Sequence, residues 1–146
     1  MCIRDSFRAA TEQPFLSQAG SGIVNGPKLD QWLAQDSYIS RGYITFVGAL
    51  IGKIRLPQVV SNTQFDPLYR ATDLLISALN NVRREMSYFE ISLTKFNLRV
   101  PDVPATPNTK AYLDLLVASS AGPSSLLEGM VVLWATHHVG LSNARL

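Results

Sequence analysis

The chain has 146 residues, of which 47% are apolar and 16% charged, so it is long enough for one domain with a real core. Its formal net charge is only +2 and its basic residues form no stripe, which argues against a nucleic-acid partner. The strongest apolar run, residues 43–54, is shorter than the about 20 residues that cross a bilayer, and no signal peptide is visible, so we expect a cytoplasmic protein without a membrane partner.

Both ends of the chain look unlike domain boundaries. Residues 1–6 show no periodicity and resemble a translated leader, so we leave them out of the predicted domain. Residues 7–12 read as the remainder of a first helix, followed by a glycine-containing loop. The apolar pattern runs through Trp134 and Val139 and then stops at Leu146. We therefore expect one partial domain over residues 7–146, with further helices of its parent missing.

A long helix is predicted from Pro27 to about Leu56. Asn25 or Gly26 can cap it, Pro27 fits the first turn because its missing N–H needs no partner there, and Pro57 stops it. Apolar residues recur along it at steps of three and four: Leu29, Trp32, Leu33, Ile39, Tyr43, Phe46, Val47 and Leu50. The glycines of this helix are expected at close contacts with a neighbouring helix: Gly42, Gly48 and Gly52.

Three more helices follow in the predicted order. One begins after Asp66 with Pro67 and ends near Asn97, and residues 98–108 form an extended connection because they contain three prolines. The next covers residues 109–119. The last opens with the capping-box spacing of Ser125 and Glu128 and continues at least to His138. Apolar stripes joined by short turns predict an all-α protein, a helical bundle.

Asp36 is the strongest candidate for a binding site. It lies in line with the apolar stripe, seven residues after Leu29 and seven before Tyr43, so its carboxylate is expected to point inward. Burying an unpaired carboxylate costs several kcal/mol, so Asp36 should meet either protein partners or a polar ligand. The alternative is a structural aspartate tied to a neighbouring helix or to Arg41.

Four further side chains are candidates on the later helices. Glu85 could reach the same pocket, although a solvated helix face is the alternative for it. Tyr88, Phe89 and Tyr112 could stack on a flat heteroaromatic ring, although aromatic residues on a stripe often belong to the core.

No metal and no cofactor is expected. His137 and His138 are adjacent, so on a helix they point about 100° apart and cannot chelate one ion together. The Glu-x-x-His spacing of di-iron bundles does not occur, and Cys2 is the single cysteine, which excludes a zinc site built from cysteines.

Several segments together resemble the TenA/thiaminase II family. They are Pro14-Phe15-Leu16, Trp32-Leu33-Ala34-Gln35-Asp36-Ser37-Tyr38, Glu85-Met86-Ser87-Tyr88-Phe89, residues 109–115 and residues 125–134, and the resemblance spans roughly residues 7–139. It implies a heme-oxygenase-like helical bundle, incomplete here at its C-terminus. It also implies a protein of thiamine metabolism that cleaves or hydrolyses pyrimidine compounds.

The family's site residues carry over only in part. Asp36 matches the aspartate that holds the aminopyrimidine ring of the substrate. Ile39 stands where many members have a second pocket tyrosine, which Tyr38 or Tyr43 could partly replace. Val132 stands where the nucleophilic cysteine of the typical bacterial enzyme would fall, and the late catalytic glutamate would lie beyond the last residue. The bacterial mechanism is therefore absent, and the catalytic residues are unknown.

Three functions remain open from the sequence. The leading one is a TenA-like hydrolase or salvage protein that takes a small aminopyrimidine ligand. The second is a non-catalytic or regulatory member of the same fold that binds a small heteroaromatic ligand. The third is a helical oligomerisation module, and a homo-oligomer is expected in any case.

Overall fold

The computed structural model describes residues 5–6, 8–9, 12, 14–59 and 62–143, without the side chains of residues 16 and 138–143. Its elements are α2 (Pro14–Gly20), α3 (Gly26–Lys53), the short 3-10 helix η1 (Thr63–Phe65), α4 (Pro67–Lys95), α5 (Pro107–Ser120) and α6 (Leu126–Asn143). No strand occurs in this described part, so the prediction of an all-α protein is confirmed. Residues 1–4 of the predicted leader and the end of the chain, residues 144–146, lie outside the described residues, as does part of the predicted helix over residues 7–12.

The helix starts follow from local capping. The side chains of Asn25, Asp66 and Thr106 accept hydrogen bonds from the free N–H groups of the first turns of α3, α4 and α5, and a proline lies in each of those turns. At α6, the Glu128 carboxylate accepts from the Ser125 N–H, while the Ser125 hydroxyl accepts from the Glu128 N–H over 3.2 Å. The capping box is therefore confirmed.

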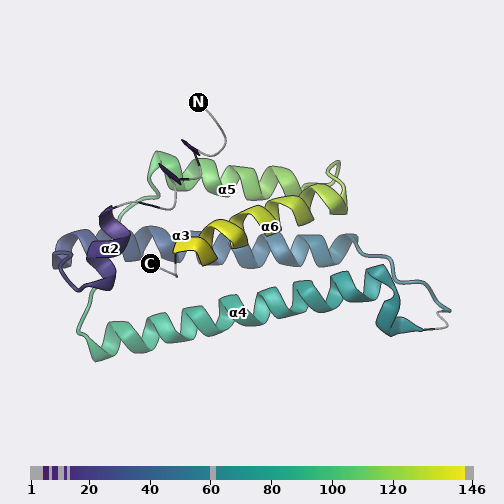
Figure 1. Ribbon diagram of the computed structural model, residues 1–146, viewed down its shortest axis with the longest axis horizontal. Coiled ribbons are helices and arrows are strands. Elements are labelled where there is room, and N and C mark those ends of the chain that lie inside the picture. The colour runs from purple at the N-terminus through teal and green to yellow at the C-terminus, as the bar shows by residue number, and fades with distance from the viewer. Residues whose placement is uncertain (1–4, 7, 10–11, 13, 60–61, 144–146) are drawn as a thin grey trace.

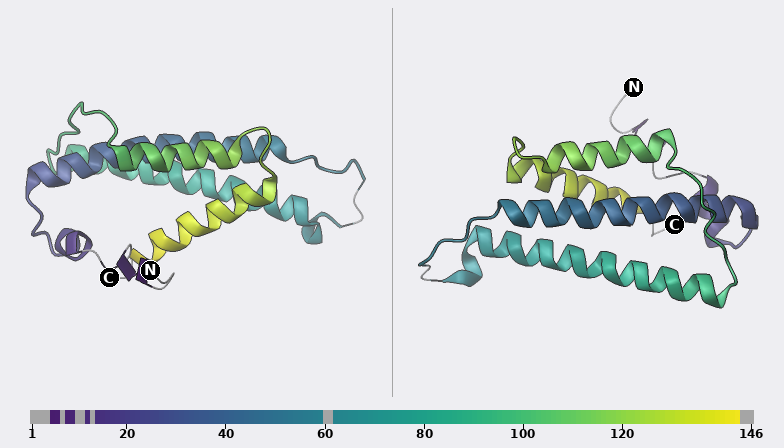
Figure 2. Two further views of the ribbon diagram at one scale, coloured as in Figure 1. Left: turned by 90° about the horizontal axis from the view of Figure 1, so that it is seen from above. Right: turned by 180° about the vertical axis from the view of Figure 1, so that it is seen from behind.

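Helix α3 is the central element of the bundle. It contacts α4, α5 and α6, and Figure 1 shows it running between α4 and α5 with α6 in front of it. Figure 2 shows that α6 crosses obliquely and diverges from α3 toward its C-terminal end. The largest fully buried side chains come from α3, α4 and α5: Phe46, Val47, Leu50, Leu75 and Leu116. The buried Leu133 of α6 joins the same cluster. Packing in this apolar core fixes the rotation of α3 about its axis and thereby the direction in which Asp36 points.

Two glycines let helices approach closely. A Cβ added at Gly42 would meet the Leu113 side chain, and one added at Gly129 would meet the Leu50 side chain. Gly48 and Gly52 have open space at this position, so the expected close contacts are confirmed for Gly42 and wrong for Gly48 and Gly52.

The structure differs from the sequence-based boundaries at three places. Helix α5 begins at Pro107 rather than at Thr109, because Thr106 caps it and proline fits a first helical turn. Residues 14–20 form α2 where a loop was expected, because Phe15 packs against Trp32 with ring centroids 6.0 Å apart and so stabilises this short helix. Helix α3 ends at Lys53 rather than near Leu56, since Ile54 is already extended and the residue before Pro57 disfavours helical backbone. Over the described ranges, no helix is long and apolar enough to cross a membrane.

Candidate functional site

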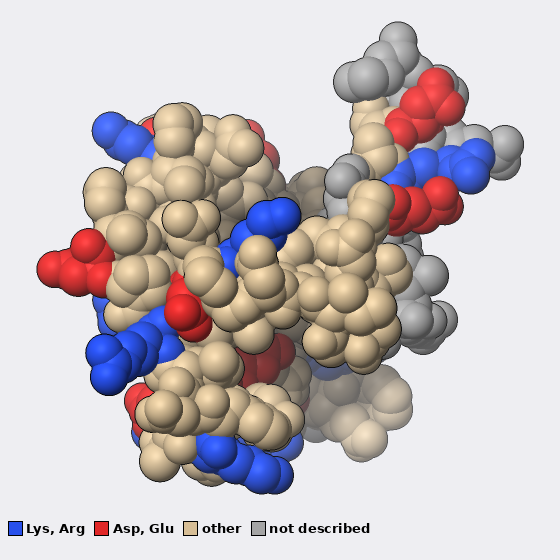
Figure 3. Space-filling view, turned by 90° about the vertical axis from the view of Figure 1, so that its left-hand side faces the viewer, with Lys and Arg blue, Asp and Glu red and all other residues tan. Residues whose placement is uncertain are grey.

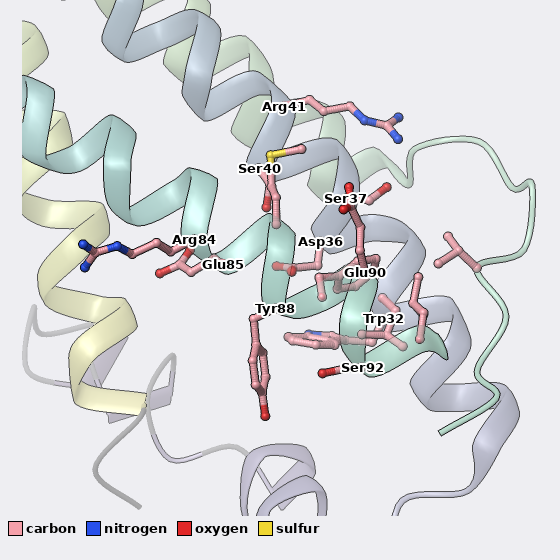
Figure 4. A pocket seen from close by; sticks show the side chains of 15 residues that line it. Trp32, Asp36, Ser37, Ser40, Arg41, Arg84, Glu85, Tyr88, Glu90 and Ser92 are labelled. Carbon is pink, nitrogen blue, oxygen red and sulfur yellow. The ribbon is translucent and has the colours of Figure 1, made fainter. Parts of the chain in front are cut away.

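A cavity of about 720 Å³ opens between the first half of α3 and the second half of α4. Figure 4 shows the side chains that line it. Four of the predicted site residues meet here: Asp36, Glu85, Tyr88 and Phe89. The connection that follows α4 adds Val100 to the wall. The long stripe of α3 and the stripe of α4 thus bring together residues that lie about 50 positions apart in the chain.

Asp36 points from α3 toward α4. Burial raises the pKa of its carboxyl, and the negative charge of Glu85 raises it further. Within the described part of the chain, no residue donates a hydrogen bond to this carboxylate or forms an ion pair with it. The Arg41 pairing considered from the sequence is not formed: Figure 4 shows the Arg41 guanidinium pointing away from Asp36. Asp36 is therefore a partly desolvated carboxyl that has no partner among the described residues.

Glu85 lies on the opposite wall of the cavity. Its side chain is exposed, and its charge acts on Asp36 across the space between the helices. The neighbouring Arg84 extends its guanidinium away from the cavity in Figure 4. The two arginines of the lining thus turn their guanidinium groups outward, while the Asp36 carboxylate points toward α4.

Aromatic side chains form the remaining wall of the cavity. The Trp32 indole and the Tyr88 phenol lie on the same side of it in Figure 4, and Phe89, which follows Tyr88 on α4, also lines the cavity. Tyr88 is 72% exposed and Trp32 44% exposed, so neither ring is buried in the hydrophobic core. A flat ring can lie against such faces while its polar edge meets Asp36.

Three predicted site residues lie away from this cavity. The Tyr38 hydroxyl donates to the backbone oxygen of Val103 over 3.1 Å. Tyr43 and Tyr112 lie where α3, α5 and α6 meet; burial raises the pKa of both phenols, and a hydrogen bond with Thr136 acts in the opposite direction. The Tyr43 hydroxyl also lies 3.4 Å from His137 Nδ1.

An apolar side chain, Val132, lies where the resemblance would place a nucleophilic cysteine. Val132 is half-buried on α6 and packs against the hydrophobic core. Among the residues described, no group of three potential metal ligands occurs, and the absence of a metal and a cofactor stays a prediction.

The sequence did not single out several lining residues. Trp32 was assigned to the apolar stripe and to the family segment but not to the site. Ser40 was not predicted, although it lies one turn after Asp36 and so shares its face. Val100 could not be found by periodicity, because it belongs to an irregular segment.

The distribution of charged side chains on the surface does not indicate a particular partner. On the face shown in Figure 3, Lys and Arg side chains are interspersed with Asp and Glu and form no continuous basic patch. The lack of a nucleic-acid partner and the expected homo-oligomer stay predictions.

Comparison with known proteins gives two informative matches, while no family model matches the sequence. The chain is 42% identical over 131 residues to a Fusarium pseudograminearum (strain CS3096) protein named "Probable transcription factor", covering 90% of this chain and 26% of that protein. It is 21% identical over 133 residues to a Glycine max protein named "Probable bifunctional TENA-E protein", covering 91% of this chain and 55% of that protein. The chain thus spans about a quarter and about half of these two relatives, and the second match supports a distant TenA-like relation.

Proposed function

We propose that this chain is the ligand-binding part of a TenA-like protein and that it binds an aminopyrimidine compound of thiamine metabolism. The observation that carries the proposal is Asp36, which is partly desolvated, faces an aromatic-lined cavity and has no partner in the described part of the chain. A structural aspartate at this depth would be expected to have hydrogen-bond partners, because leaving it unsatisfied costs free energy.

An aminopyrimidine matches this carboxyl in its hydrogen-bonding groups. Its exocyclic amine donates and its ring nitrogen accepts, side by side on one edge. The raised pKa lets the carboxyl of the ligand-free protein carry a proton, which passes to the ring nitrogen when the ligand binds; the two carboxylate oxygens then accept from the ring N–H and from the amine. The faces of the ring can then lie against Trp32 and Tyr88.

The same chain supplies binding groups more plainly than reacting groups. Val132 cannot attack a substrate, so a hydrolytic step of the bacterial kind has no agent at this position. We therefore assign ligand recognition to this chain, and we propose that hydrolysis, if the whole protein performs it, depends on residues outside these 146.

A second candidate is a non-catalytic member that binds the same ligand class and acts in regulation. Val132 favours it, and so does the name of the Fusarium relative, which is 42% identical over most of this chain. Both candidates require the Asp36 cavity, and they differ only in whether the ligand is turned over.

Isothermal titration of the protein with hydroxymethyl aminopyrimidine tests the binding proposal. Saturable one-site binding that is lost with the same pyrimidine lacking its exocyclic amine is the expected result. Equal binding of the two compounds, or no binding of either, would refute the role of Asp36 in recognition. Ammonia release from an aminomethyl analogue, measured on the complete parent protein, separates the hydrolase from the non-catalytic candidate.

A further inference from the structure

The connection from α4 to α5 forms one wall of the candidate cavity. It runs from Phe96, which caps α4, to Thr106, which caps α5, and its Val100 lines the cavity. Prolines at positions 101 and 104 remove backbone donors from this segment, so it cannot be held by a regular ladder of hydrogen bonds. Side chains of other elements can therefore contribute to fixing its position.

Gln35 holds one end of this segment from α3. Its side-chain Nε2 donates to the backbone oxygen of Pro104 over 3.2 Å, and its Oε1 accepts from the Thr106 N–H over 2.8 Å. A single amide group therefore satisfies two backbone groups of the connection, much as a neighbouring strand would. The contacts join residues 69 and 71 positions apart in the chain.

Tyr38 holds the same segment one helical turn further along α3. Its hydroxyl donates to the backbone oxygen of Val103 over 3.1 Å. Gln35 and Tyr38 are three residues apart and so share one face of α3, while Asp36 and Ser40 occupy the neighbouring face that opens to the cavity. One turn of α3 thus carries both Asp36, the proposed ligand-binding residue, and the two side chains that hold the connection from α4 to α5.

We propose that Gln35 and Tyr38 are positioning residues that fix the segment of residues 100–104 against α3, and that they thereby set which ligand sizes the Asp36 cavity admits. The part that concerns ligand size rests on the proposed function, whereas the fixed position of the segment does not. Neither side chain lines the cavity, so neither needs to touch the ligand.

Trypsin gives a test of the wall that needs no ligand. Arg99 is exposed and directly precedes Val100, so cleavage after it reports on the connection. In a double variant, Gln35→Leu with Tyr38→Phe, we expect cleavage at Arg99 to accelerate about fivefold or more for each hydrogen bond lost. Cleavage at the exposed Arg55, in the loop after α3, is the internal reference and should keep its wild-type rate.

Lys53 provides a matched control from the other end of α3. Its ammonium group donates to the backbone oxygens of Ala121 and Ser124, so it also holds a loop through backbone acceptors. Lys53→Met should leave the Arg99 cleavage rate unchanged. An unchanged ratio of Arg99 to Arg55 cleavage in the double variant would overturn the proposal.

Ligand selectivity gives the second readout, which a purely structural role would not move. Two aminopyrimidines that differ by one methylene on the ring are titrated into each protein; the wild type should prefer the smaller by roughly tenfold. In the double variant this preference should fall toward unity. A preserved preference alongside faster Arg99 cleavage would overturn the selectivity role. If the wild type binds neither compound, the proposed function fails and the size role fails with it, while accelerated cleavage would still establish the two residues as supports of the wall.

Discussion

Replacing Asp36 by asparagine is expected to stabilise the ligand-free fold and to weaken ligand binding at the same time. Asp36 is partly desolvated, is repelled by Glu85 and has no hydrogen-bond partner among the described residues. An amide of nearly the same shape carries no charge, so it loses less hydration free energy in the same place. A structural aspartate would give the opposite sign, because its removal would break contacts that stabilise the fold.

The expected magnitudes are set by this environment. The free energy of unfolding at neutral pH should rise by on the order of 1 kcal/mol, which corresponds to roughly 2–4 °C in the melting temperature of a chain of this size. The affinity for hydroxymethyl aminopyrimidine should fall by about 1.5–3 kcal/mol, or about 10- to 150-fold, because the charge-assisted hydrogen bond is lost.

The pH dependence has a definite sign. Because the folded carboxyl has a raised pKa, it holds its proton more tightly than the unfolded one, and its contribution to stability is complete below the ordinary aspartate pKa. That contribution is lost as the pH rises through the raised pKa. Asp36→Asn should remove this loss, so the two proteins should differ little in acid and most at neutral pH.

Thermal unfolding monitored by circular dichroism, together with calorimetric titration, measures both effects on the same samples. Asp114→Asn is the control, since Asp114 is exposed on α5 and does not line the cavity. A lower melting temperature for Asp36→Asn at neutral pH would refute the reasoning, because it would show that the carboxylate is held by contacts within the protein.

The remaining predictions concern the aromatic wall, the helix contacts and the last helix cap. Tyr88→Ala should weaken aminopyrimidine binding by about 1 kcal/mol with little change in melting temperature, whereas Phe65→Ala, an equally exposed aromatic outside the cavity, should leave binding unchanged in the same titration. Gly129→Ala should lower the free energy of unfolding, measured with urea, by about 1–3 kcal/mol because the added Cβ would meet a buried leucine. Gly48→Ala should raise it by about 0.5–1 kcal/mol, since there is open space for a Cβ at position 48. Hydrogen bonds from Ser125 lower the pKa of Glu128, so the contribution of this carboxylate to stability is lost as the pH falls through the lowered pKa. Glu128→Ala should therefore flatten the dependence of the melting temperature on pH in the acid range. An unchanged dependence would contradict the role of Glu128 in the cap.

The sequence was sufficient to predict the long helices, because their signals are local. Asn25 and Asp66 cap helices whose first turns contain proline, and the stripe of α3 predicted which of its faces is buried. The inward position of Asp36 followed from the same periodicity. The short helix α2 was not predicted because it depends on the contact of Phe15 with Trp32 of α3. No local sequence pattern predicts a contact between residues on two sides of a turn.

Contacts between distant residues explain the other differences at the site. The hydroxyl of Tyr38 is bound to a backbone oxygen 65 positions away, in an irregular segment whose path no periodicity predicts. The sequence pattern predicted no separate role for Gln35, although its amide is hydrogen-bonded to the same segment. Sequence spacing could place these residues on faces of α3, but it could not say which face the connection after α4 would cross.

The polar groups inside this bundle differ in whether the protein already satisfies them. Tyr43 and Tyr112 have hydrogen bonds with Thr136, and Tyr43 also lies beside His137, so a ligand that reached them would first have to replace those bonds. Asp36 has no such partner to replace in the part of the chain that the structure describes. Since a hydrogen bond adds most to binding where the protein group was left unsatisfied, recognition should be concentrated at the Asp36 end of α3, and variants of the two tyrosines should change stability more than affinity.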